Sequence, residues 1–257
     1  MAITHVSRIA GPALRELRVV TFAAAEPITV ARLPDATVSL LFRARPGGGG
    51  DLSVLGPLTR ARYKQASGVA FTVRAVLSPA VARAVVGVPL GELTDRIVSL
   101  DAVWGRAATA LRDRLANIPC ELVARELAAA VIARVPRRPR ATDTLVARAR
   151  TLLDGGESVA RIARGLGVNE RTLRRAFVDR TGLSPKRYAR IARLQRVLAR
   201  TRGGGVAWAR LARELGYFDQ AHLVNDFREL VAATPEAFRH ARPWPSAPTD
   251  VVGRCAP

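Results

Sequence analysis

Cysteine and histidine are scarce in this chain of 257 residues, which holds two cysteines and three histidines. Cys120 and Cys255 lie 135 positions apart, and the histidines His5, His222 and His240 are equally scattered. A zinc cluster needs four such ligands at short spacings, and a disulfide framework needs more cysteines. We therefore expect no metal site, no cofactor and two unreactive cysteines, one at a helix start and one in a tail.

Long apolar runs are also missing, although 49% of the residues are hydrophobic. No run approaches the ~20 apolar residues that a membrane-spanning helix needs. Residues 1–17 lack the basic-then-apolar order of a signal peptide. These features predict no membrane partner and a location in a reducing cytoplasm.

Acidic residues are too few to balance the basic ones. The chain has 41 Lys and Arg against 21 Asp and Glu, a formal net charge of +20 and a pI near 11.7. All but two of the cations are Arg, which high-GC codon usage explains, but codon usage does not explain a twofold excess of base over acid. A field of this sign attracts polyanions, so we expect a nucleic-acid partner.

The length predicts two domains, the first over residues 1–135. Its front part is typical of strands, because short β-branched or apolar runs alternate with Pro, Gly and Asp. These runs are Leu17–Phe22, Ile28–Leu33, Val38–Phe42 and Val69–Val76. Residues 46–51 (PGGGGD) predict a hairpin loop, and since no Gly-Lys-Ser/Thr follows, they do not form a phosphate-binding loop.

From Ser78 the pattern becomes helical. Ser78 and Pro79 predict the start of a short helix, and Gly87 predicts its end. Two longer helices are expected over Asp101–Leu115 and Glu121–Val135, separated by a proline.

Two prolines and three arginines follow and predict a basic linker over residues 136–141. The chain is then almost wholly helical to residue 242, and residues 243–257 are expected to be a disordered tail. The expected fold class is therefore α+β: an N-terminal domain of mixed strands and helices (1–135) is followed by an all-α domain (142–242).

The helical part contains an internal repeat. Residues 158–190 align with residues 207–239, at a separation of 49 positions before a turn and 50 after it. The matching pairs are Leu166 and Leu215, Gly167 and Gly216, Phe177 and Phe227, Pro185 and Pro235, and Tyr188 and Phe238.

Each repeat has the physical features of a helix-turn-helix. Ala163 and Ala212 allow two helices to approach closely, and Gly167 and Gly216, four positions later, allow the positive φ that ends the first helix. A polar N-cap and an amphipathic second helix follow, which leaves the outer face of that helix free for a major groove. The caps and buried anchors are Asn169, Leu173 and Phe177 in the first repeat, and Asp219, Leu223 and Phe227 in the second.

The outer face of the second helix in the first repeat is rich in arginine. It carries Arg171, Thr172, Arg174 and Arg175. An arginine can bind guanine O6 and N7 with two hydrogen bonds, or contact phosphate, although each one taken alone could be a solvated side chain. The helix that joins the repeats adds cations suited to phosphates or to a merely charged surface: Lys186, Arg187, Arg190, Arg193, Arg196 and Arg200.

Residues 142–242 resemble the AraC/XylS family of bacterial transcription regulators, on the motifs LGVNERTLRRAF, TGLSPKRY and LGYFDQAHL. The resemblance implies two helix-turn-helix units in successive major grooves on one face of promoter DNA, tethered by the joining helix. It also implies RNA polymerase, a small-molecule effector and a second copy of this chain as possible partners. By position, base contacts would come from Arg171, Arg174 and Arg175, and from Gln220, Ala221, Val224 and Asn225.

The second unit departs from the family pattern. Val224 and Asn225 stand where Ser and Arg are usual, and Asp226 adds an acid where a small residue is usual. Phe218 replaces a small polar residue in the turn, and Ala232 replaces a glycine. Residues 142–202 hold 15 basic and 5 acidic residues, whereas residues 203–257 hold 6 of each. We therefore expect the second unit to bind weakly or to read DNA shape, with Asn225 and Gln220 able to read adenine.

The first domain resembles a front domain of undefined ligand found in a subset of these regulators. The stretches that carry the resemblance are Leu33–Phe42, Gly87–Leu93, Asp95–Val98 and Leu100–Gly105. Ala36 and Ser39 depart from the Gly and the second acid usual there. A turn role for Asp35 is favoured over ligand binding, and a core role for Trp104 over a place in a pocket. Sensing and dimerisation are the functions that the resemblance suggests for this domain.

Two other classes of function compete with sequence-specific regulation. An enzyme fused to a DNA-binding module, such as an alkyl-repair protein with a zinc-held cysteine, would need ligands that Cys120 lacks, and no nucleophile–base–orienter set is present. A non-specific nucleoid-associated or RNA-binding protein would share the charge. It differs in that random DNA would compete with a promoter fragment equally well.

We predict that Arg175→Ala abolishes sequence-specific DNA binding. One bidentate contact to guanine contributes about 1–3 kcal/mol to the discrimination between sequences, and this contribution is lost. Asn225→Ala should cost less, because the neutral second unit contributes less. Gel-shift titrations of both variants at one fixed salt concentration measure this ranking, and equal losses would contradict it.

Overall fold

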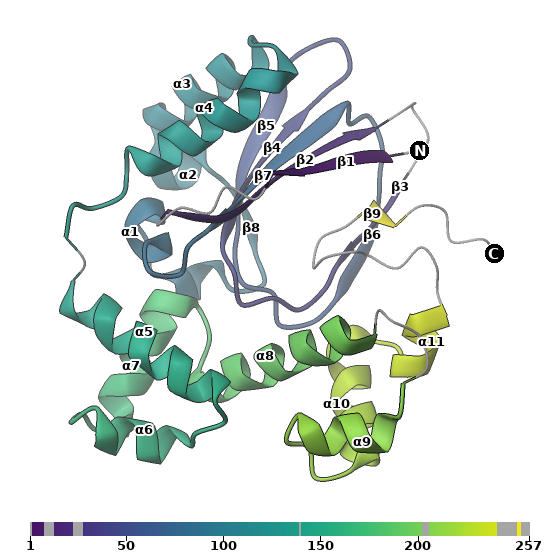
Figure 1. Cartoon of the computed structure of the whole chain (residues 1–257). Coiled ribbons are helices and arrows are strands. Elements are labelled where there is room, and N and C mark those ends of the chain that lie inside the picture. Colours follow the sequence, from purple (N-terminus) through teal and green to yellow (C-terminus); the bar gives the residue numbers. More distant parts are fainter. Residues whose placement is uncertain are drawn as a thin grey trace.

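Two β-sheets and a layer of helices build the N-terminal half, and a second group of helices packs along one end of the sheets (Figure 1). The structure is a computed structural model, and it describes residues 2–7, 13–22, 28–138, 140–201, 206–240 and 251–252. We call the described residues before position 140 the N-terminal half, and the helices from residue 141 onward the helical half. None of the helices in this described part is both long and apolar enough to cross a membrane.

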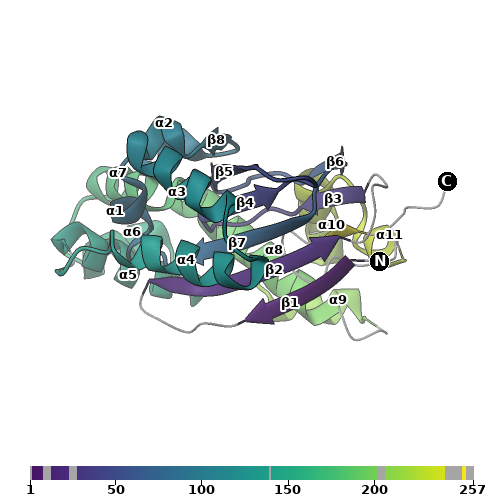
Figure 2. The same ribbon diagram turned by 90° about the horizontal axis from the view of Figure 1, so that it is seen from above.

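The larger sheet has six strands in the order β1-β2-β7-β4-β5-β8, and every neighbouring pair is antiparallel. Figure 2 shows this order from β1 to β5 across the sheet. Its strands are β1 (Ala2–Ser7), β2 (Leu14–Phe22), β4 (Ser39–Ala44), β5 (Gly50–Leu55), β7 (Phe71–Leu77) and β8 (Ile97–Ser99). The smaller sheet is antiparallel, in the order β6 (Arg62–Ala66), β3 (Ile28–Arg32) and β9 (Val251–Val252).

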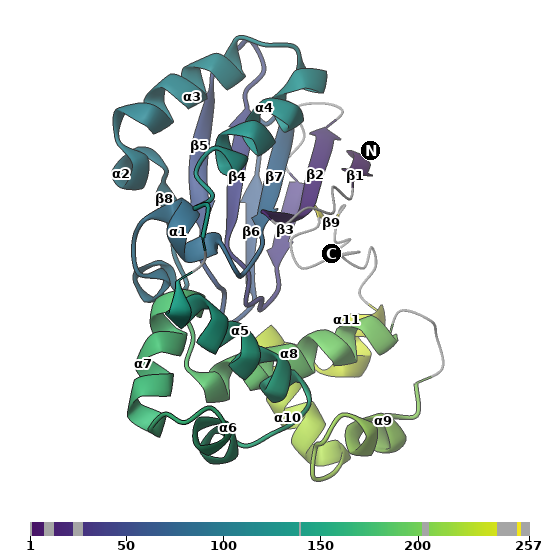
Figure 3. The same cartoon turned by 60° about the vertical axis from the view of Figure 1, so that its left-hand side comes forward.

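The two faces of the large sheet have different partners, as period-2 alternation requires. On β4, Leu40 and Phe42 are fully buried in the core beneath the helices, while Leu41 and Arg43 point to the other face, toward the small sheet. Helices α3 (Arg106–Ala116) and α4 (Cys120–Ile132) cover the first face (Figure 3). The main core of the N-terminal half lies between this helical layer and the sheet.

The strands are more numerous than the sequence patterns predicted. The four expected runs correspond to β2, β3, β4 and β7, but β1, β5, β6 and β8 were not predicted. Strand β6 has exposed polar side chains and so lacks apolar alternation, and β8 lies in a segment that was wrongly expected to be helical. The hairpin loop predicted at 46–51 is present but shorter: it lies between Ala44 and Gly50, Arg45 N–H donates to Gly49 O (3.2 Å), and Gly50 and Asp51 already belong to β5.

The helices of the N-terminal half are shorter than expected. Helix α1 (Ala82–Val86) begins three residues after Pro79 and ends, as predicted, at Gly87. The helix expected over Asp101–Leu115 is wrong as one element, because Gly105 (φ 58°, ψ −138°) divides it into α2 (Asp101–Trp104) and α3. That conformation is open only to glycine.

Three side chains in the stretches that carry the N-terminal resemblance make structural contacts. Trp104 is buried and its Nε1 donates to Val85 O (3.0 Å), so it belongs to the core, as favoured. Asp35 accepts from Thr37 N–H (2.9 Å) and pairs with Arg74 (3.5 Å), which agrees with a turn role. Ser39 accepts from Arg74 Nε (2.9 Å). These contacts account for Asp35 and Ser39 without a ligand.

The tandem repeat folds as predicted. The helical half consists of α5 (Ala141–Asp154), α6 (Val159–Gly165), α7 (Glu170–Thr181), α8 (Pro185–Arg200), α9 (Trp208–Glu214), α10 (Gln220–Val231) and α11 (Pro235–His240). The pairs α6–α7 and α9–α10 lie at opposite ends of α8 (Figure 1). Gly167 (φ 68°) and Gly216 (φ 76°) have the expected positive φ, and Asn169 and Asp219 accept the backbone N–H of Thr172 and His222 (both 2.7 Å).

Each unit has its own apolar core, and α8 contributes to both. Tyr188 and Ile191 pack with the first unit, and Leu194, Val197 and Leu198 with the second. Helix α5 begins at the last residue of the expected linker; within that linker Pro139 lies outside the described residues. The expected tail also lies outside them, except for β9.

The N-terminal half contacts both helix-turn-helix units. Leu33 is buried in the core of the second unit, where Ala61 N–H donates to Leu230 O (2.7 Å) and Tyr63 Oη to Val231 O (3.0 Å). Gln195 of α8 donates to Pro34 O. At the other end of α8, the short 3-10 helix η1 (Leu90–Leu93) and α1 lie against α7.

A buried ion pair fastens α5 to α7. Arg180 Nη1 lies 2.7 Å from Asp143 Oδ1, and the two side chains are only 9% and 8% exposed. Asp143 also accepts the backbone N–H of Arg140 (2.9 Å) at the start of α5. The pair thus ties the start of the helical half to α7.

We predict that Asp143→Ala lowers the free energy of unfolding by about 3 kcal/mol, because among the described residues it leaves the buried Arg180 guanidinium with Asp179 as its one remaining acidic partner. The double variant Asp143→Leu, Arg180→Met should recover most of the loss, since a buried pair can be replaced by apolar residues of similar volume. Urea unfolding followed by circular dichroism tests both. A double variant as unstable as Asp143→Ala would contradict this account.

Candidate DNA-binding interface

Helix α7 has one buried and one solvent-exposed face. Leu173 and Phe177 are buried in the first core, and the predicted residues Arg171, Thr172, Arg174 and Arg175 are all exposed. Arg171, Arg174 and Arg175 are spaced i, i+3, i+4, so they share one stripe of the helix. The structure therefore places three arginine side chains together on the exposed face of α7.

One of these arginines is oriented by a neighbour. Arg174 Nη2 lies 2.9 Å from Glu170 Oε2, one turn earlier on α7, and Arg174 remains 61% exposed. A pair this exposed contributes little stability, so the Arg174 guanidinium is free to exchange its carboxylate for a base or a phosphate.

The residues of α10 that were predicted to contact DNA differ in their exposure to solvent. Gln220, Ala221 and Asn225 are exposed, whereas Val224 is half-buried. Phe218, in the turn before α10, is 89% exposed, and its backbone N–H donates to His222 Nδ1 (3.3 Å). The outer surface of the second unit is therefore mostly neutral and partly apolar.

Asp226 does not belong to this outer surface. It is 7% exposed, accepts from Tyr217 Oη (3.2 Å) and pairs with Arg190 of α8. Burial, and then the Asp226 charge, raise the pKa of Tyr217, so this hydroxyl stays protonated and donates. The acid that departed from the family pattern on the recognition helix is therefore part of the core of the second unit.

The cations of α8 divide into two groups. Arg190 pairs with Glu229 (Nη1–Oε1 3.0 Å) as well as with Asp226, and these bonds raise its pKa. Arg193 donates to Gly216 O (3.2 Å), and Arg200 lies 3.5 Å from Glu214. Arg190 is therefore held at the second unit by two acids, while phosphate contact by Arg193 and by Arg200, which is still 65% exposed, stays a prediction.

The other α8 cations remain available. The side chains of Lys186, Arg187 and Arg196 are exposed and have no ion pair among the described residues. Lys186 and Arg187 lie in the first turn of α8, directly after the turn that follows α7. This position next to the arginine-rich helix suits contact with the DNA backbone.

The sequence did not predict that the N-terminal half borders α7. A shallow depression is lined by Pro89, Gly91 and Glu92 on one side and by Arg174 and Arg175 on the other. Thr94 Oγ1 donates to Gly182 O just beyond α7, and Arg83 Nε lies 3.3 Å from Asp179 Oδ1. Glu92, an exposed acid, therefore lies at the edge of the arginine stripe.

The cysteines and histidines of the described residues form no cluster. No group of three metal-ligating side chains occurs among the described residues. Cys120 is exposed at the first residue of α4, as expected, and a hydrogen bond to Glu121 raises the pKa of its thiol. Cys255 and the side chain of His5 lie outside the described residues.

A family model described as a helix-turn-helix domain matches residues 162–241, which span both units from α6 to the end of α11. Residues 162–241 form an AraC-type helix-turn-helix domain. Domains of this type belong to DNA-binding transcription regulators. The AraC-type domain accounts for the two repeats and for the helix that joins them.

Several solved structures are similar to this chain. An AraC-type transcriptional regulator from Chromobacterium violaceum is 23% identical over 41% of this chain and 97% of its own, with a TM-score of 0.37. ToxT from Vibrio cholerae is 12% identical over 93% of this chain and 97% of its own, with a TM-score of 0.41. No curated protein sequence matches the chain.

We predict that Asp226→Ala lowers the free energy of unfolding by about 1–3 kcal/mol, because the Tyr217 hydroxyl loses its partner in the core. DNA affinity at a temperature where the variant is folded should not rise. Glu170→Ala is the matched control: it removes an exposed acid from α7, so affinity should rise while stability changes by less than about 0.5 kcal/mol. Higher DNA affinity of Asp226→Ala would mean that this carboxylate faces DNA.

Proposed function

We propose that the protein is a sequence-specific, DNA-binding transcription regulator whose helices α7 and α10 enter successive major grooves on one face of a promoter. The observation that carries the proposal is the stripe of Arg171, Arg174 and Arg175, exposed on the helix whose opposite face anchors the first core. A recognition helix with its N-terminal residues toward the bases is the docking geometry of helix-turn-helix proteins.

The first unit supplies most of the sequence reading in this proposal. Arg171, Arg174 and Arg175 bind guanine O6 and N7, with Thr172 beside them at the start of the helix. On binding DNA, Arg174 exchanges its ion pair with Glu170 (2.9 Å) for a base or a phosphate. Lys186 and Arg187 neutralise phosphates and set the register of the helix without reading sequence.

The second unit adds weaker contacts that suit A·T pairs. Gln220 and Asn225 carry amide groups that can bind adenine N6 and N7 with two hydrogen bonds. Ala221, Val224 and the exposed ring of Phe218 offer apolar surface of the kind that contacts the thymine methyl group. The site would then be richer in G·C where α7 binds and in A·T where α10 binds.

The N-terminal half acts as the controlling domain in this proposal, through a small effector or by pairing with a second copy. Its contacts with both units support this role, because any change in its shape reaches α7 through η1 and α10 through residues 61–63. RNA polymerase completes the set of proposed partners, on the resemblance to the family alone.

Non-specific binding is the second candidate function. The N-terminal half supports it, because residues 1–140 hold 20 basic against 10 acidic residues and so carry as much net charge as the DNA-binding half. Selection of bound sites from random DNA separates the two candidates. An enriched motif with two half-sites one helical turn apart supports the regulator, and no enriched motif supports the non-specific binder.

We predict that affinity for the selected site falls steeply with salt, with a log–log slope of about −0.9 for each phosphate contacted. Lys186→Ala and Arg187→Ala should each reduce that slope by about 1 and weaken binding to all sequences alike. Arg125→Ala, which removes an exposed cation from α4, is the control and should leave the slope unchanged. Slopes equal to that of the unaltered protein in all three variants would remove Lys186 and Arg187 from the interface.

A further inference from the structure

The turn of the second helix-turn-helix unit is one residue longer than that of the first. Val168 N–H donates to Ala163 O (3.0 Å) in the first turn, and Tyr217 N–H donates to Ala212 O (2.9 Å) in the second. Ala163 and Ala212 are equivalent positions of the repeat, so Tyr217 occupies the place of Val168. The N-cap follows at once in the first unit but one residue later in the second. Phe218, the residue in between, therefore has no counterpart in the first unit.

The ring of this inserted residue is almost fully exposed. Phe218 is 89% exposed, whereas the other large exposed hydrophobic residues in the described part of the chain are 36% to 58% exposed. Its backbone is held in place, because its N–H donates to His222 Nδ1 (3.3 Å) and the His222 ring packs edge-on against Tyr217, with 5.3 Å between the ring centroids. The turn thus presents an uncovered aromatic ring just before the start of α10.

Two outward positions of α10 are apolar where those of α7 are cationic. At a separation of 50 positions, the three arginines of the α7 stripe correspond to Ala221, Val224 and Asn225. Ala221 is exposed and Val224 is half-buried, and the two are neighbours on the helix surface because they are spaced i, i+3. The first turns of α10, together with Phe218 before them, therefore offer apolar side chains at the end of the helix that helix-turn-helix proteins turn toward the bases.

The edges of the base pairs in the major groove present one apolar group. All other groups there are hydrogen-bond donors or acceptors, and the exception is the C5-methyl group of thymine. An apolar side chain on a recognition helix can therefore distinguish bases by contacting that methyl group. Cytosine methylated at C5 carries the same group at the same place in the groove, so such a contact does not distinguish it from thymine.

We infer that the second unit reads the C5-methyl groups of pyrimidines through Phe218 and Val224, and that methylation of a cytosine at a contacted position raises the affinity for DNA. This inference rests on the proposed function, because it requires α10 to lie in a major groove. Burial of one methyl group corresponds to about fourfold in affinity. Thymine should differ from deoxyuridine, and 5-methylcytosine from cytosine, by that factor.

The first unit provides an internal control, because its outward positions carry arginines. Arginine binds O6 and N7 of guanine, and methylation of the paired cytosine leaves both atoms in place. Whatever effect a methyl group has in the half-site under α7, a change at Phe218 should not alter that effect.

The test replaces single thymines of the selected site by deoxyuridine, which pairs identically but lacks the methyl group. We expect at least one thymine under α10 at which this replacement weakens binding by the unaltered protein about fourfold. Phe218→Ala or Val224→Ala should bind the two duplexes equally well. At the same position, a 5-methylcytosine–guanine pair should bind the unaltered protein about fourfold more tightly than a cytosine–guanine pair. Fluorescence anisotropy at one fixed salt concentration measures all four duplexes.

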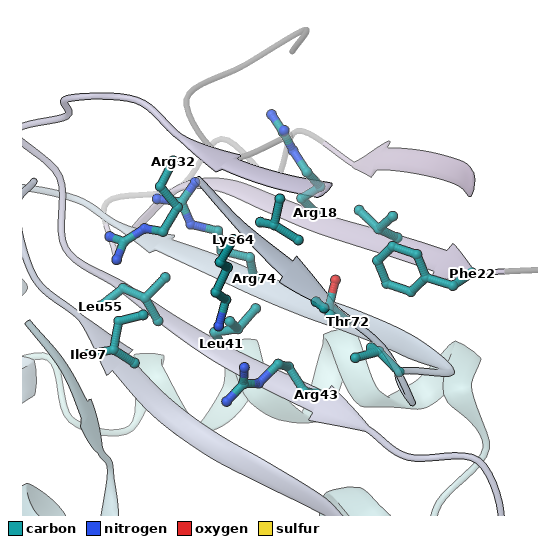
Figure 4. Close-up of a pocket in the computed structure, with 14 residues that line it drawn as sticks. Arg18, Phe22, Arg32, Leu41, Arg43, Leu55, Lys64, Thr72, Arg74 and Ile97 are labelled. Atoms are coloured by element: carbon teal, nitrogen blue, oxygen red, sulfur yellow. The ribbon is translucent and has the colours of Figure 1, made fainter. Parts of the chain in front are cut away.

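Ile97→Ala is the matched control, because it removes an exposed apolar side chain from β8, at the cavity between the two sheets (Figure 4). This variant should keep the full response to deoxyuridine. The melting temperature of Phe218→Ala should equal that of the unaltered protein, since the Phe218 ring is almost fully exposed. A response lost in Phe218→Ala is then not a folding defect.

A half-site under α10 without thymine, no response at any of its thymines, or a response that persists in both Phe218→Ala and Val224→Ala would overturn the inference. Each of these results leaves the selected site, and with it the proposed function, intact. If selection enriches no motif, the proposed function itself fails. An unselected duplex with every thymine replaced by deoxyuridine then decides the methyl contact, and equal affinity for the two duplexes counts against it.

Discussion

The second helix-turn-helix unit ends against the small β-sheet, where the amide of Ala61 donates to Leu230 O in the last turn of α10. The last carbonyls of a helix have no partner within it, so a partner from another element determines where the helix ends. Here Ala61 and Tyr63 supply two such partners, and Leu33 enters the apolar core beside them. The core of the second unit is thus completed by the N-terminal half, and α8 cannot change its angle to the sheets without breaking these contacts.

Three arginines of the helical half lie in three different environments. Arg180 is buried and holds α5 to α7, Arg190 is half-buried and holds α8 to α10, and Arg175 is exposed on the recognition helix. The environments differ because Arg180 and Arg190 form ion pairs with buried acids. Asp143 and Asp226 are both nearly inaccessible, so their arginines are committed to the fold. The excess of base over acid that first indicated a nucleic-acid partner is therefore divided between arginines paired inside the fold and arginines exposed on its surface.

The parts of the structure that local chemistry determines could be predicted from the sequence. The two units, their glycine turns, their caps and the buried anchors of α7 and α10 follow from spacings within about 20 residues, and the exposed arginine stripe follows from the anchors. What could not be predicted depends on contacts between distant segments. Strand β6 has no apolar pattern because it is an edge strand with an exposed face. The sequence suggests that Asp226 is a surface acid, because its partners Tyr217 and Arg190 are identified only in the folded structure. Nothing in residues 89–92 indicates that they border α7.

The N-terminal half contacts the helical half near both ends of α8, through η1 and α1 at α7 and through residues 33, 61 and 63 at α10. It therefore connects α7 and α10, the two helices proposed to read DNA. One base pair inserted between two half-sites rotates the second groove by about 35° about the duplex axis, since a turn holds about 10–10.5 base pairs. Helices α7 and α10 cannot follow that rotation while both are held by the N-terminal half. Either the DNA must twist, or the contacts of the N-terminal half with one of the two helices must break. Under the proposed function, the helical phase between two half-sites therefore links the contacts of the N-terminal half to the choice of promoter.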